Sequence, residues 1–68
     1  MRNGTVKFYN EEKGYGFITP SDGSKDVFFH VKTINRCLPH GTILKSGDVV
    51  YFEEETTRKG VEASEIEL

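Results

Sequence analysis

The sequence has few of the residues that usually cross-link a very small protein. Cys37 is the one cysteine among 68 residues, so no internal disulfide can form. One cysteine and two histidines are also too few for a structural zinc site, which usually has four ligands. A domain of this size is only marginally stable unless it packs well or is cross-linked. We therefore expect a well-packed apolar core, with no bound metal and no other cofactor.

Long apolar runs are absent as well. Nothing approaches the roughly 20 apolar residues of a membrane-spanning helix. The first residues, MRNGTVKF, also lack the apolar run of a signal peptide. We therefore expect a cytoplasmic protein with no membrane segment. No stretch keeps the i, i+3, i+4, i+7 apolar spacing of an amphipathic helix for three turns, so a helical fold is not expected either.

The chain has no excess of positive charge. Its formal net charge is -2 at pH 7, and the charges are unevenly distributed. Residues 1–47 hold seven Lys or Arg against four Asp or Glu, whereas residues 48–68 hold two against seven. Domains that grip polyphosphate by charge usually have a high pI. Any binding of nucleic acid by this chain must therefore depend on more than bulk charge.

Short apolar or alternating runs between turn residues are present instead, and they predict an all-β fold. The five expected strands are residues 5–10, 15–20, 26–31, 48–55 and 61–68. Residues 32–46 lack a strand pattern and contain Pro39 and Gly41, so we predict a long loop there, with one helical turn near residues 33–35. Five strands in a single domain over residues 1–68 predict a small closed or nearly closed barrel, because closure removes unpaired strand edges.

The alternation of side chains along each strand divides the apolar residues between two faces. Seven residues form the predicted core: Val6, Ile18, Val27, Phe29, Val50, Phe52 and Ile66. Val6 and Phe8 would share a face in a regular strand, so this core requires a bulge or twist near Lys7. Tyr9 and Tyr51 are predicted to be partly buried structural residues.

The predicted core leaves four aromatic residues on the other face of three consecutive strands. These are Phe8, Tyr15, Phe17 and Phe28. Two of them belong to the stretch KGYGFI, residues 13–18, whose glycines we expect to allow close packing and strand curvature. Lys7, Lys13 and His30 would surround the resulting patch. Rings between basic groups suit single-stranded nucleic acid, because bases stack on the rings while cations meet the phosphates.

Other interpretations of these patterns remain open. An exposed apolar patch could instead meet a partner protein, which would make the chain a small β-barrel protein-interaction module. KGYGFI also matches the RNP1 pattern of RNA-recognition motifs, but that fold needs helices that this sequence does not predict. Cys37 and His40 could suggest half a metal site or a nucleophile pair, but no orienting acid is evident. We therefore expect no enzyme, no catalytic residues and no small-molecule substrate.

From near Thr5 to near Ile66 the chain resembles the bacterial cold-shock protein family. The resemblance is carried by VKFYNEEKGYGFITPSDGSKDVFFHV, by the strand from Gly47 to Phe52 and by the RKG turn. It implies a five-stranded antiparallel OB-type β-barrel that binds single-stranded RNA and DNA without catalysis. The nucleic-acid-binding residues that the resemblance implies are Lys7, Phe8, Lys13, Tyr15, Phe17, Phe28 and His30, with Arg58 nearby.

The chain departs from the family pattern at three places. Phe8 stands where the family typically has tryptophan, and Val31 stands where it typically has another aromatic residue. The loop after Ile34 is about two residues longer than in familiar members, and it has Cys37, Leu38, Pro39 and His40 where those members often have an aromatic residue. The sequence has no Walker-type phosphate loop, so any melting of nucleic-acid structure must be passive. We expect a monomer that acts as a nucleic-acid chaperone, melts weak structure and regulates transcription or translation.

Overall fold

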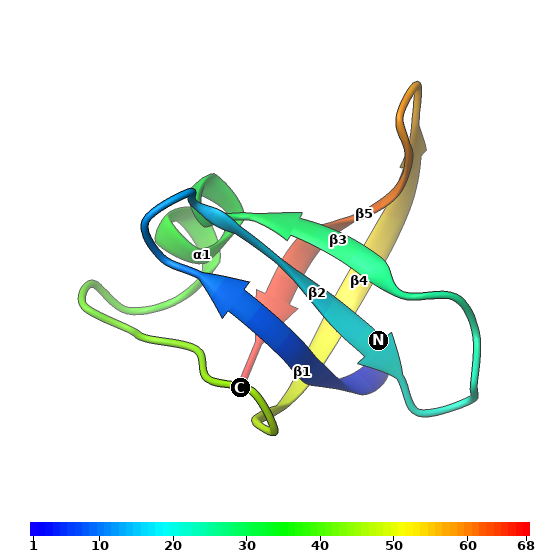
Figure 1. Cartoon of the computed structure of the whole chain (residues 1–68), viewed down its shortest axis with the longest axis horizontal. Helices are drawn as coiled ribbons and strands as arrows, with labels where there is room; N and C mark the ends of the chain where they lie inside the picture. Colours follow the sequence, from blue (N-terminus) through cyan, green and yellow to red (C-terminus); the bar gives the residue numbers. More distant parts are fainter.

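The computed structural model describes all 68 residues, which form a β-barrel with one short helix (Figure 1). The elements are β1 (Arg2–Asn10), β2 (Tyr15–Pro20), β3 (Val27–His30), α1 (Val31–Cys37), β4 (Val49–Thr57) and β5 (Gly60–Glu67). The predicted all-β barrel of five strands is confirmed, although the first strand begins earlier than expected. The helix α1 has seven residues and is too short to span a membrane.

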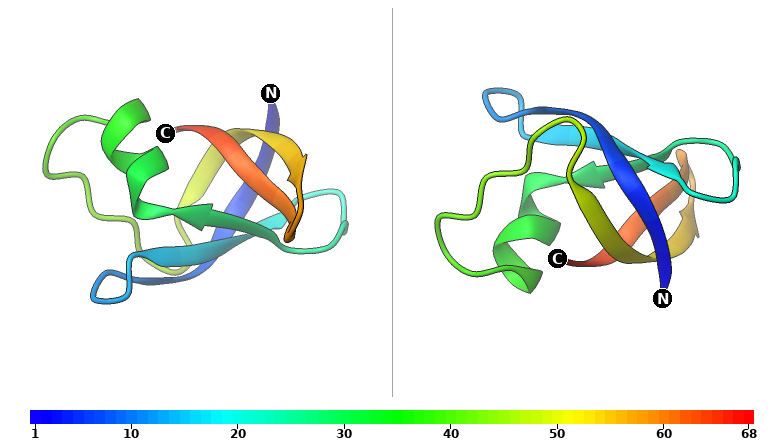
Figure 2. Two further views of the ribbon diagram at one scale, coloured as in Figure 1. Left: turned by 90° about the horizontal axis from the view of Figure 1, so that it is seen from above. Right: turned by 90° about the horizontal axis from the view of Figure 1, so that it is seen from below.

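The strands close into a barrel in the order β1-β2-β3-β5-β4 (Figure 2). Four neighbouring pairs are antiparallel, but β3 and β5 are parallel where Phe28 lies opposite Glu62. The prediction of a wholly antiparallel barrel is therefore wrong at this junction. Antiparallel neighbours alternate in direction, and an odd number of strands cannot alternate all the way around a closed ring. One parallel pair is a geometric requirement of five strands.

The predicted core is confirmed, since each of its seven side chains has 1% or less of its surface exposed. The structure adds four further residues to it: Ile34, Leu38, Leu44 and Ala63. Ile34 belongs to α1, which is longer than the predicted helical turn. The helix forms because it buries Thr33 and Ile34 while packing against β3 and β5. Tertiary packing thus stabilises a helix too short to be stable alone.

The bulge required near Lys7 is also present. Val6 pairs with Ile18 and Phe8 pairs with Phe17, so Lys7 is the extra residue on β1. A bulge of this kind changes the face to which the following residues point. Val6 is therefore 1% exposed in the core, whereas Phe8 is 36% exposed on the outer face.

The two tyrosines that were predicted to be partly buried differ. Tyr9 packs against the core, with its ring stacked 5.7 Å from the ring of Phe29. Tyr51 is 46% exposed, so that prediction is wrong. It lies on β4 between Asn3 of β1 and Glu67 of β5, where no further element covers the sheet.

Gly16 lies where β2 passes closely over the core. A Cβ atom at this position would stand 2.6 Å from Cζ of Phe29 and would also overlap the backbone carbonyl of Phe8. The bare inner side of KGYGFI thus lets β2 approach the Phe29 ring, while Tyr15 and Phe17 point outward. The expected role of this glycine in close packing is confirmed.

We therefore expect Gly16→Ala to lower the free energy of unfolding by about 1–3 kcal/mol or more, because backbone and ring must both move. Urea denaturation measures the change. Gly23→Asn is the control, since Gly23 has open space around it, and its positive φ imposes only a backbone cost that Asn bears better than other residues. Equal losses in the two variants would contradict the close approach at Gly16.

Candidate nucleic-acid interface

Four aromatic side chains meet on the outer face of β1, β2 and β3, and we call them the ring patch: Phe8, Tyr15, Phe17 and Phe28. Phe17 is the cross-strand neighbour of both Phe8 and Phe28, which places it at the centre. Its ring centroid lies 5.5 Å from that of Phe8 and 5.7 Å from that of Phe28. The structure therefore brings together all four rings that the sequence singled out.

The ring patch remains open to solvent. Phe8 is 36% exposed and the other three rings are half-buried. Phe17 meets Tyr15 and Phe28 edge-on, at interplanar angles of 88° and 74°. Aromatic rings prefer such contacts because the edge of one ring is positive and the face of another is negative. The four rings thus form a preformed aromatic surface that is large enough to contact a few planar groups.

The two lysines predicted for the site differ in whether their charge is paired. Lys13 is exposed in the turn between β1 and β2 and forms no ion pair. Lys7 donates from Nζ to Oδ2 of Asp26 at 2.9 Å. Asp26 also accepts a hydrogen bond from the Thr19 hydroxyl. The Asp26 carboxylate therefore holds Lys7 at the edge of the ring patch, and the charge of Lys7 is already paired.

The hydrogen bond from Lys7 lowers the pKa of Asp26 below its ordinary value of 3.8. A group whose pKa is lowered in the folded state stabilises the fold above its ordinary pKa and loses that contribution as the pH falls. The pair is therefore present at neutral pH and is lost only as the pH falls below 3.8. Its contribution to stability is small, because both groups are well solvated.

His30 ends β3 and caps the start of α1. Its Nδ1 accepts a hydrogen bond from the backbone N–H of Lys32 at 3.1 Å. In a neutral imidazole the nitrogen that accepts is the one without a proton, so Nε2 carries the N–H. His30 also lies opposite Tyr15 in the register of β2 and β3. It thus offers a hydrogen-bond donor beside the ring patch.

We expect His30→Ala to lower the free energy of unfolding by about 0.5–2 kcal/mol, the usual effect of losing an N-cap. His30→Asn should lower it much less, because Asn is a good N-cap residue. Thermal or urea unfolding of the two variants gives the comparison. If both variants are as stable as the unaltered protein, a capping role for the imidazole is contradicted.

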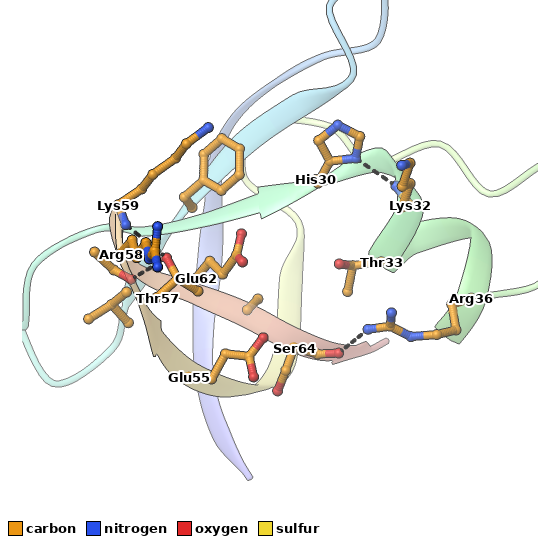
Figure 3. A pocket seen from close by; sticks show the side chains of 14 residues that line it. His30, Lys32, Thr33, Arg36, Glu55, Thr57, Arg58, Lys59, Glu62 and Ser64 are labelled. Carbon is orange, nitrogen blue, oxygen red and sulfur yellow. Dashed lines mark hydrogen bonds between the residues drawn. The ribbon is translucent and has the colours of Figure 1, made fainter.

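A groove borders the ring patch on the other side of β3, and we call it the α1–hairpin groove (Figure 3). Its volume is about 690 Å³, and β3, α1, β4 and β5 all contribute to its walls. Phe28 and His30 line it, so the groove and the ring patch share the β3 strand. Arg58, which the sequence placed near the site, lies in the turn that joins β4 to β5.

The groove contains three cations that the sequence reasoning did not assign to a site. Lys32 and Arg36 come from α1, and Lys59 stands beside Arg58 in the turn between β4 and β5. Residues four apart share one face of a helix, so Lys32 and Arg36 point to the same side. That spacing would have identified them, but the segment was expected to be mainly a loop.

The two positions where the resemblance leads one to expect further rings are filled differently. The backbone N–H of Val31 donates to the carbonyl of Gly14, and its side chain packs beside that glycine. In the longer loop, Leu38 is buried in the core, whereas Pro39 and His40 are exposed. No group of three or more His, Cys, Asp or Glu side chains is placed to hold a metal ion.

Comparison with known proteins gives consistent matches over nearly the whole chain. The family model described as the 'Cold-shock' DNA-binding domain matches residues 2–68. Cold shock protein CapA of Pseudomonas fragi is 45% identical over 62 residues, which are 91% of this chain and 94% of that protein. Cold shock-like protein CspE of Escherichia coli is 47% identical over 64 residues, which are 93% of this chain and 88% of that protein.

A solved structure shows the same fold. The structure named 'drosophila Unr CSD456' superposes with a TM-score of 0.75 and 24% sequence identity. The match covers 98% of this chain and 26% of that longer chain. At this level of identity the comparison bears on the fold, and it agrees with the OB-type barrel that the sequence resemblance implied.

Proposed function

This chain belongs to the cold-shock domain family, as the sequence resemblance predicted, and we propose that its ring patch binds single-stranded RNA and DNA without catalysis. The observation that carries the proposal is the contact of four half-exposed rings on one face of β1, β2 and β3. All four rings come from one chain, so a monomer suffices to form the surface.

Stacking would supply most of the binding free energy. Each base that stacks on an aromatic side chain contributes about 1–3 kcal/mol. Bases in a duplex are already stacked on each other, so their faces are not available to the ring patch. We therefore propose a preference for single strands over duplexes. His30 would add a hydrogen bond from Nε2–H to an acceptor on a base.

On the ring patch itself, charge would contribute less than stacking to the free energy of binding. Lys13 and Arg58 are free to meet phosphates, whereas Lys7 is paired with Asp26. Each phosphate contact to a single strand adds about -0.7 to the slope of log affinity against log salt concentration. A strand that occupies only the ring patch should therefore show a slope of about -2 or shallower.

A fluorescence titration of one labelled sequence, as a single strand and as a duplex, tests the proposal. Tyr15→Ala should weaken binding of the single strand by about 1–3 kcal/mol. Tyr51→Ala is the matched control, because this exposed tyrosine lies on β4, away from the ring patch. Failure of the single strand to bind would contradict the proposal and favour the protein-interaction module.

We further propose that the protein acts as a nucleic-acid chaperone by trapping strands that have already opened. A base-pair step in DNA contributes about 1.4 kcal/mol of stacking, whereas each base on the ring patch gains about 1–3 kcal/mol. A few stacked bases can therefore offset the loss of a few base pairs.

A series of hairpins of increasing stem length, each with a fluorophore and a quencher, measures strand opening in the absence of ATP. We expect short stems to open when protein is stoichiometric or in excess, and opening to fade as the stem lengthens. Efficient opening of a long stem by substoichiometric protein would refute passive trapping. Failure to open even the weakest stem would refute a chaperone role.

A further inference from the structure

We propose that the α1–hairpin groove is a second contact site, which binds the phosphates of a single strand as it continues beyond the ring patch. This inference rests on the proposed function and extends it to a part of the surface formed by α1 and the turn between β4 and β5. It assigns a new phosphate-binding role to Lys32, Arg36 and Lys59, which line the groove beside Arg58, a residue that the family resemblance already implies. The class of ligand is an extended polyanion with regularly spaced phosphates.

The distribution of charge on the molecule favours this site. Four of the nine Lys and Arg residues of the chain line the groove, against only two of its eleven Asp and Glu residues. The groove is therefore locally basic on a protein whose formal net charge is -2. A cleft lined by cations of one sign concentrates anions more than the net charge of the protein suggests.

The four cations are also unpaired. Elsewhere on the protein, Arg2 forms ion pairs with Asp22 and Glu54, and Lys7 forms one with Asp26. None of the Lys or Arg residues in the groove lies within ion-pair distance of a carboxylate. Their charges are therefore available to an incoming anion without the loss of an existing contact.

The cations lie on both walls of the groove. Figure 3 shows Lys32 and Arg36 on the helix side and Arg58 and Lys59 on the hairpin side. The Arg36 side chain is held across the groove, because its Nη2 donates to the backbone carbonyl of Ser64. Its remaining N–H groups can still donate to phosphate oxygens, since a guanidinium has five donors.

The position of the groove makes it a continuation of the ring patch. Phe28 belongs to both surfaces, and it pairs with Phe17 on one side and with Glu62 on the other. A strand that stacks on Phe17 and then on Phe28 is therefore led across β3 toward β5 and α1. His30 stands at the same boundary and can contact the nucleotide at the crossing.

The two carboxylates in the groove help to define the ligand. Glu62 lies between the two walls and is half-buried, and Glu55 is exposed at one end (Figure 3). They disfavour a single small anion seated on the floor of the groove. A strand that spans the groove can instead place successive phosphates against the cations of each wall, while the bases lie between them.

The test compares a strand of about four nucleotides, which fills only the ring patch, with one of about ten nucleotides, within the range of known OB-fold site sizes. Affinities are measured over a range of salt concentrations for the unaltered protein and for the double variant Lys32→Gln/Lys59→Gln. Neither side chain makes a hydrogen bond or ion pair, so the fold should be unaffected. Lys45→Gln is the control, because Lys45 is exposed outside both surfaces.

For the unaltered protein, we expect the salt slope to be steeper for the long strand than for the short strand by about 2.1, which corresponds to three added phosphate contacts at Lys32, Arg36 and Lys59. The double variant should bind the long strand roughly five- to tenfold more weakly at low salt and lose most of the added slope. Its affinity for the short strand should not change, and Lys45→Gln should behave like the unaltered protein with both strands.

Equal salt slopes for the two strands, or equal effects of the double variant on both, would overturn the groove assignment and leave the ring patch intact. Failure of the unaltered protein to bind either strand would overturn the proposed function, and the groove assignment with it. A glutamate peptide of the same charge as the long strand should compete poorly. If it competes as well as the strand, the groove is a site for acidic protein segments and our proposal is wrong.

Discussion

Replacing Phe29 by alanine is expected to lower the free energy of unfolding by about 3–5 kcal/mol, whereas replacing its neighbour Phe28 is expected mainly to weaken binding. Phe29 is fully buried, packs over Gly16 and stacks with Tyr9. Phe28 points to the opposite face of β3, where its ring is half-buried in the ring patch. Phe28→Ala should weaken single-strand binding by about 1–3 kcal/mol.

Urea denaturation and oligonucleotide titration of the two variants separate these effects. Each variant serves as the control for the other, because the same side chain is removed from adjacent positions of one strand. If Phe28→Ala unfolds the protein as severely as Phe29→Ala, the Phe28 ring is a core residue. The assignment of the two faces of β3 would then be wrong.

The double variant Phe17→Ala/Phe28→Ala should weaken single-strand binding by about 2–6 kcal/mol, because two adjacent stacking surfaces are lost. The two rings lie in contact at 5.7 Å, so their effects on affinity should not simply add. The unaltered protein, both single variants and the double variant together form a double-mutant cycle. The coupling in this cycle measures how far one ring positions the other.

A matched control for this cycle removes an aromatic surface from elsewhere on the barrel. Tyr51→Ala does so on the outer face of β4, where the exposed ring belongs to neither the ring patch nor the groove. Its affinity should equal that of the unaltered protein. If the double variant binds as tightly as the Tyr51 variant, stacking on the ring patch does not hold the strand.

Much of the barrel could be predicted because strand alternation is a local property of the sequence. It separated Phe28 from Phe29 and required a bulge between Val6 and Phe8, and both features are present in the structure. The parallel pair of β3 and β5 was missed, because it follows from closing an odd number of strands rather than from any one segment. The length of α1 was missed because its two buried residues, Thr33 and Ile34, are too few to form a visible helical period.

The candidate site was predictable to a similar extent. The rings could be grouped because they alternate on strands that follow one another in the chain. The pairing of Lys7 with Asp26 could not be anticipated, because it depends on how β1 and the segment before β3 lie side by side in space. The groove was missed for the same reason, since its cations come from α1 and from a distant turn that only the closed barrel brings together.

Chemical-shift mapping of the backbone amides by NMR, during titration with a short single strand, tests the central claim most directly. We predict that the largest shifts arise on β2 and β3, at Tyr15, Phe17, Phe28 and His30, and that a strand of about ten nucleotides extends them to Lys32 and Lys59. The amides of Val49 and Tyr51 on β4 should not move. Shifts concentrated on β4, with β2 and β3 unchanged, would contradict the ring patch as the site where this protein binds nucleic acid.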